Sequence, residues 1–83
     1  MAGTIRLLVF GGAKVITGTG EIVFPLAAPC TAAELFDALC HRYPGLVAHQ
    51  RSMRLAINGS YVKVSEQVSP GDEVALIPPV AGG

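Results

Sequence analysis

The sequence predicts an α+β domain in which one helix covers one face of a mixed β-sheet, with the elements in the order β-β-α-β-β-β. Three observations predict this fold class. Apolar runs with strand-type alternation lie near both ends of the chain, one amphipathic helical stretch lies between them, and Gly, Pro or Asn turn signals separate the elements. The chain has 83 residues, of which 51% are hydrophobic. That length suffices for one packed core and not for two, so we expect one domain over residues 1–83.

The first strand is expected over residues 4–10, which are mostly β-branched and aliphatic. Because side chains alternate across a strand, one face carries Ile5, Leu7 and Val9. The opposite face carries Leu8 and Phe10. We expect the first set to face the helix.

The segment after this strand is rich in glycine. Four glycines within residues 11–20 predict a turn or a flexible loop. A second strand is expected over about residues 21–26. Pro25 and Pro29 mark its end and favour an edge position in the sheet, because proline cannot donate a ladder hydrogen bond.

A capping box opens the only helix that the sequence predicts, over residues 31–42. The Thr31 hydroxyl can accept a hydrogen bond from the first turn, while the Glu34 carboxylate can reach back to the Thr31 amide. An apolar stripe at helical spacing follows, formed by Leu35, Phe36, Leu39 and Tyr43. Pro44-Gly45 then ends the helix.

Three short strands are expected in the last third of the chain. Residues 53–58 and 61–64 flank an Asn-Gly dipeptide, which is a strong hairpin signal. Residues 69–72 predict a further turn, and residues 73–77 a final strand that a proline pair ends.

The charge pattern and the lengths of the apolar runs exclude several classes of partner. Six basic residues balance six acidic ones and are dispersed, whereas nucleic-acid binders carry a basic excess or stripe. No apolar stretch approaches the roughly 20 residues of a membrane span, and no signal peptide is recognisable. Helical spacing places Cys30 and Cys40 roughly 14 Å apart, too far for a disulfide. We therefore expect a cytoplasmic protein whose partners are neither nucleic acid nor membrane.

No constellation of residues suggests a complete active site or a metal centre. His41 and His49 stand on either side of a Pro-Gly break, and a helix end is a favourable place for His41. Cys30 and Cys40 lack the spacing of redox or zinc sites and are expected to be small buried residues, with a sulfur-handling thiol as the alternative. Turn chemistry explains Asp72. We expect this chain itself to bind no metal and no cofactor.

The most informative segment is the end of the sequence. It consists of Pro78, Pro79, Val80, Ala81, Gly82 and Gly83. The two prolines favour an extended segment, so we expect residues 78–83 to form a flexible tail that projects from the sheet and ends in a narrow tip without side chains. A frayed terminus is the alternative. A carboxylate at Gly83 is inert until ATP activates it as an acyl adenylate, and partner enzymes can supply all the acid–base chemistry.

An apolar surface is expected beside the root of this tail. In the last strand Val74 and Leu76 belong to the helix-facing set, so Ala75 and Ile77 face outward. If the first and last strands are neighbours, the outward apolar residues form one patch: Leu8, Phe10, Ala75 and Ile77. Such patches usually mark interaction sites, and a covering loop is the alternative.

The ending Gly-Asp-Glu-Val, followed by Pro-Pro-Val-x-Gly-Gly at residues 78–83, resembles the C-terminus of the MoaD family. These are the small subunits of molybdopterin synthase, within the ThiS/MoaD ubiquitin-like β-grasp proteins. Residues 6–10, 41–46 and 56–58 are similar to the family's first strand, helix end and third strand. The resemblance therefore covers the whole chain in element order and length.

The resemblance implies a β-grasp fold and a sulfur-transfer cycle. A MoeB-like enzyme uses ATP to adenylate Gly83, and a persulfide donor converts it to a thiocarboxylate. The tail then enters a MoaE-like large subunit, within a heterotetramer, where the sulfur passes to cyclic pyranopterin monophosphate and builds the molybdopterin dithiolene. The active site lies on the large subunit, and this chain is a sulfur donor without catalytic groups. By position, Phe10 and Ile77 match hydrophobic contact residues of the family.

The segment after the first strand departs from the family pattern. An Ala-Arg-Glu type sequence is replaced by Gly11-Gly12-Ala13-Lys14, and Lys14 is the candidate for the basic contact. Carriers that serve thiamin, cysteine or tRNA thiolation share the Gly-Gly tip, so those pathways remain alternatives. A ubiquitin-like modifier joined to lysines through Gly83 and a passive binding module that uses only the sheet face remain as well.

Overall fold

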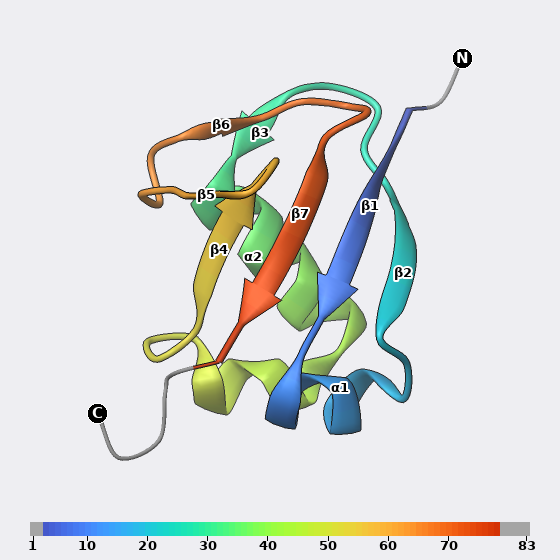
Figure 1. Cartoon of the computed structure of the whole chain (residues 1–83), viewed down its shortest axis with the longest axis vertical. Helices are drawn as coiled ribbons and strands as arrows, with labels where there is room; N and C mark the ends of the chain where they lie inside the picture. Colours follow the sequence, from blue (N-terminus) through green and yellow to red (C-terminus); the bar gives the residue numbers. More distant parts are fainter. Residues whose placement is uncertain (1–2, 79–83) are drawn as a thin grey trace.

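A five-stranded mixed sheet carries helix α2 (Ala32–Arg42) against one of its faces in the computed structural model, which describes residues 3–78 (Figure 1). The strand order is β2-β1-β7-β4-β5. The bounds are β1 Thr4–Val9, β2 Glu21–Pro25, β4 Arg54–Ile57, β5 Ser60–Tyr61 and β7 Glu73–Ile77. This is the expected α+β architecture, and β2 lies at an edge as its prolines predicted.

The central pair of strands confirms the predicted division of faces. β1 and β7 run parallel, with Leu7 beside Val74 and Val9 beside Leu76. All four side chains are at most 2% exposed and pack toward α2. The stripe on α2 meets them, because Leu35, Phe36 and Leu39 are buried and Tyr43 is packed against the same core. Burial of these two apolar faces holds the layers together.

Residues 11–17 correct the expectation of a loop. Helix α1 (Gly11–Thr17) forms there, because Ala13 is fully buried and Ile16 packs against the core. The glycines stand at the ends of this helix, where they cost little. Gly18 closes it in the left-handed conformation at φ 79° and donates to the carbonyl of Lys14.

Three further elements were missed, and several strands are shorter than expected. The 3₁₀ helix η1 (Pro44–His49) follows α2 directly and buries Leu46. β3 (Cys30–Thr31) and β6 (Gln67–Val68) form a separate two-stranded sheet. β3 and β6 have two residues each, too few to show an alternating pattern in the sequence.

The predicted caps and turns are present. Thr31 accepts from the Glu34 amide at 3.1 Å, and the Glu34 carboxylate accepts from the Thr31 amide at 2.8 Å. The β4–β5 hairpin turns at Asn58 and Gly59 with φ 50° and 89°, the left-handed pair that an Asn-Gly turn requires. The Asp72 carboxylate accepts from the Ser69 amide at 2.9 Å and thereby closes the turn before β7.

Candidate functional site: an apolar sheet face beside the root of the tail

The outer face of the sheet, opposite α2, carries one continuous apolar surface. Leu8 on β1 stands beside Ala75 on β7, and Ala75 stands beside Ala56 on β4. Ala56 in turn faces Tyr61 on β5. Cross-strand partners share a face, so these four residues form a row across four strands.

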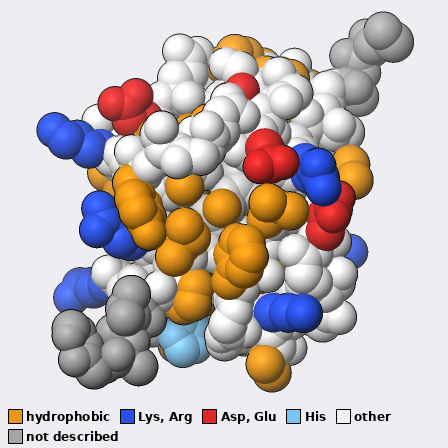
Figure 2. Space-filling model, in the orientation of Figure 1, with side chains coloured by type: hydrophobic (Ala, Val, Ile, Leu, Met, Phe, Trp, Pro, Cys, Tyr) orange, Lys and Arg blue, Asp and Glu red, His pale blue; other side chains and the backbone are white. Residues whose placement is uncertain are grey.

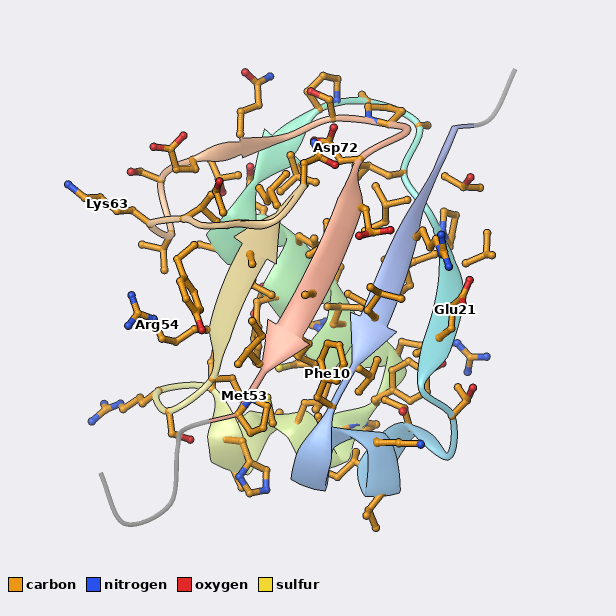
Figure 3. The ribbon with its side chains drawn as sticks, viewed as in Figure 1. Phe10, Glu21, Met53, Arg54, Lys63 and Asp72 are labelled. Carbon is orange, nitrogen blue, oxygen red and sulfur yellow. The ribbon has the colours of Figure 1, made fainter. Side chains whose placement is uncertain are left out.

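Two larger side chains extend this row toward one end of the sheet. Ile77 follows Ala75 by two residues on β7, and Phe10 directly follows β1, whose last residue Val9 pairs with Leu76. Phe10 is labelled over the ends of these strands in Figure 3. We call the six residues the sheet-face patch: Leu8, Phe10, Ala56, Tyr61, Ala75 and Ile77. Figure 2 shows hydrophobic side chains gathered over the middle of this face.

The patch is accessible except at Ala56, which is buried between its neighbours. Phe10 is 49% exposed and Tyr61 is 61% exposed, while Leu8, Ala75 and Ile77 are half-buried. Large aromatic side chains in this setting are the usual anchors of protein interfaces. Among the described residues, no loop covers the patch, so the structure leaves this face available for a partner.

Two members of the patch were missed from the sequence. Ala56 and Tyr61 belong to β4 and β5, and they join the row only because β4 pairs with β7. No short stretch of the sequence indicates which residue of β7 pairs with which residue of β4, because the two strands are far apart in the chain. The alternation of β4 could have placed Ala56 on the face opposite to Leu55, but not beside Ala75.

Charged residues border the patch on its β2 side. The Arg6 guanidinium lies 2.8 Å from the Glu21 carboxylate and 3.5 Å from that of Glu73 (Figure 3 labels Glu21). The hydrogen bond to Glu21, reinforced by its charge, raises the pKa of Arg6 above its ordinary value. An apolar centre with a polar rim is the arrangement found in protein–protein interfaces.

The opposite border is cationic. The Arg54 guanidinium stacks over the ring of Tyr61, 4.8 Å from its centroid. Arg54 also stands beside Ile77 in the β4–β7 register. Paired charges therefore flank the patch on one side. On the other side stands an arginine that has no carboxylate within 4 Å among residues 3–78.

Lys14 is exposed on α1, and the last atoms of its side chain approach Gly20, just before β2. It lies at the end of the sheet where Phe10 leaves β1 and not within the row of the patch. Its predicted role in partner binding stays a prediction.

The root of the tail lies at the same end of the sheet as Phe10. Pro78 follows β7 directly, and its ring packs against Gly11: a Cβ at Gly11 would lie 2.8 Å from Cγ of Pro78. Gly11 has φ +57°, which favours glycine in any case. The other tail positions named from the sequence lie outside the described residues: Pro79, Val80, Ala81, Gly82 and Gly83.

The described residues hold no assembled catalytic or metal-binding group. No cluster of three or more His, Cys, Asp or Glu side chains occurs in residues 3–78. Cys30 and Cys40 are both free thiols, and burial raises the pKa of each, with the charges of Glu34 and Asp37 adding to the effect. A raised pKa makes a thiol a weaker nucleophile at neutral pH. None of the helices over the same residues has the length and apolar character of a membrane span.

Comparison with known proteins identifies the family. The family model described as ThiS matches residues 7–83. The molybdopterin synthase sulfur carrier subunit of Pyrenophora tritici-repentis is 38% identical over 88 aligned residues, covering 99% of this chain and 92% of that protein. The human protein of the same name is 30% identical, with coverage of 95% and 93%.

The fold has a counterpart among solved structures. The crystal structure of SAMP1 from Haloferax volcanii superposes with a TM-score of 0.80 at 25% identity, covering 98% of this chain and all of that one. The resemblance indicated by the residues before and at the Gly-Gly tip is thereby confirmed. The chain belongs to the ThiS family, among the molybdopterin synthase sulfur carrier subunits.

Proposed function

We propose that this chain carries sulfur as a thiocarboxylate on Gly83 and delivers it to the large subunit of molybdopterin synthase, against which the sheet-face patch docks. The observation that supports this most directly is the position of the patch. Phe10 and Ile77 stand at the end of the sheet from which Pro78 leads into the tail, so one partner can hold the body and receive the tail.

The chemistry requires little from the body of the protein. An activating enzyme transfers AMP from ATP to the Gly83 carboxylate and releases pyrophosphate, and the outer sulfur of a persulfide then displaces AMP. A thiol cleaves the resulting acyl disulfide, which releases the thiocarboxylate and leaves a disulfide. The described residues support a passive role, because they offer no nucleophile with a lowered pKa and no cluster of ligands. ATP and the catalytic groups belong to the partner enzymes. The two free cysteines fit a reducing cytoplasm.

Docking through the patch would position the tail. The residues after Pro78 span at most roughly 17 Å when extended, so the reactive end stays close to the docked body. Fixing the patch on the large subunit therefore raises the effective concentration of the thiocarboxylate in its active site. We propose the heterotetramer of the related synthases as the working assembly.

Changing the length of the tail tests the proposal. Removal of Gly83 leaves a carboxylate on Gly82 but draws it back by about 3.5 Å, and addition of one glycine after Gly83 displaces it outward by the same distance. We expect each variant to lose at least about 100-fold in sulfur transfer, because misplacement by about 1 Å can already cost that much. Thermal unfolding should be unchanged, since neither change touches residues 3–78.

Intact mass provides the second measurement. After incubation with the activating enzyme, ATP and a sulfur donor, the free chain should gain the mass of one oxygen-to-sulfur exchange. Full sulfur transfer without Gly83 would refute the proposal. Isopeptide-linked remnants of the tail on lysines of other proteins, with no thiocarboxylate, would indicate a protein modifier instead.

A further inference from the structure

A groove opens at the sheet edge opposite β2, between α2 and the β4–β5 hairpin. Its volume is about 260 Å³, and its apolar wall includes Ala32 and Phe36 from α2, Leu55 from β4 and Val62 after β5. Small-molecule sites usually enclose roughly 300–1,000 Å³. This groove is smaller and open, so it fits one or two side chains better than a cofactor.

The groove exists because the hairpin splays apart. Next to its turn the two limbs pair normally, and the Val62 amide still donates to the Leu55 carbonyl at 3.1 Å. Two residues later the chain has moved to the start of α2, where the Val64 carbonyl accepts from the Ala33 amide at 3.0 Å. The departing limb is thus held by α2, and the space between it and β4 stays open.

Cations stand at the mouth of this groove. Arg54 and Lys63 line it and are exposed, and Figure 3 labels both on this side of the molecule, with Met53 near Arg54. Within residues 3–78, the ion pairs are those that Arg6 makes near β2. Neither Arg54 nor Lys63 therefore has a carboxylate within 4 Å in this part of the chain, and both charges are available to a ligand.

We propose that this edge groove binds an acidic segment of a partner protein, in which a bulky apolar side chain is flanked by carboxylates. The apolar wall would receive the side chain, and Met53 can adapt to its shape. Arg54 and Lys63 would pair with the carboxylates on either side. Two cations beside a cavity of side-chain size suit a short peptide segment better than a nucleic acid, which needs an extended basic surface.

The edge groove is a different surface from the sheet-face patch, although Arg54 borders both. Its apolar wall comes from α2 and from the helix-facing side of β4, as the burial of Leu55 in the core shows. The inference therefore does not depend on sulfur transfer. Its test needs neither the large subunit nor ATP, so its failure would leave the proposed function untouched.

Titration of the full ¹⁵N-labelled chain with synthetic hexapeptides tests the inference by NMR. The probe is Glu-Glu-Phe-Leu-Glu-Glu, and the comparison peptides replace Phe-Leu by Ala-Ala or every Glu by Lys. We expect saturable shifts of the amides of Ala33, Leu55 and Val62 with the probe. The Ala-Ala peptide should bind at least about tenfold more weakly, because it lacks the buried side chains.

Charge variants locate the binding. Lys63→Glu should weaken the probe about fivefold or more, since an attraction becomes a repulsion. Arg42→Glu is the matched control: it makes the same charge change at the far end of α2, where Arg42 lies 5.3 Å from the Tyr43 ring, and it should leave affinity unchanged. The inference is wrong if no peptide shifts the groove amides, if the lysine peptide binds as well as the probe, or if the two variants weaken binding equally.

Discussion

Truncation of Phe10 to alanine should weaken docking on the large subunit while leaving the fold intact. Phe10 is 49% exposed in the free chain. A phenylalanine can bury on the order of 200 Å², so a partner that covers the exposed half removes about 100 Å² of apolar surface from water. At about 25 cal/mol per Å² this corresponds to about 2.5 kcal/mol, or roughly 70-fold in Kd.

Isothermal titration calorimetry with the large subunit measures this loss. Val47→Ala is the matched control, because Val47 is also an exposed apolar residue, at 55%, but lies on η1 and belongs neither to the sheet-face patch nor to the edge groove. It should change the Kd less than about twofold. Thermal unfolding of both variants should stay close to wild type, since substitutions at exposed positions usually change stability by less than about 0.5 kcal/mol. Wild-type affinity of Phe10→Ala would refute the assignment of the patch as the docking surface.

Two further predictions concern the body of the protein. Thr31→Ala removes the cap of α2 and should cost about 1 kcal/mol, seen as a fall of roughly 4–8 °C in Tm; an unchanged Tm would contradict the capping argument. The hydrogen bonds from the Thr31 amide and hydroxyl lower the pKa of Glu34. The stability that the ionised Glu34 carboxylate adds to the folded chain is therefore fully present above the ordinary glutamate pKa, and it is lost as the pH falls through the lowered value. Burial, with a smaller contribution from the charge of Asp37, raises the pKa of the Cys40 thiol. Iodoacetamide at neutral pH should therefore modify Cys40 at least about tenfold more slowly in the folded chain than in urea. Equal rates would contradict its burial.

Local patterns were sufficient for much of the fold. The capping box placed the start of α2 correctly, since Thr31 and Glu34 satisfy each other's backbone amides without outside help. The Asn-Gly dipeptide also placed the hairpin turn correctly, because Asn and Gly adopt the left-handed backbone conformation that this turn requires. Period-two alternation assigned Leu7 and Leu8 to opposite faces correctly, because the pleat of a strand dictates it.

The error at residues 11–17 shows where local reasoning ends. Glycine-rich composition predicted a loop, yet burial of Ala13 against the core stabilises α1. Glycine propensity is worth at most about 1 kcal/mol per residue, and tertiary burial of an apolar face can outweigh it.

The sequence by itself determined the fold class, the faces of the first and last strands and the tail as the reactive candidate, because each depends on residues close together in the chain. Tertiary structure decided that Ala56 and Tyr61 join the patch, and that the hairpin opens into a groove. Both depend on which distant segments pair and where they separate. Such pairings are set by the packing of the whole core, and no short stretch of residues encodes them.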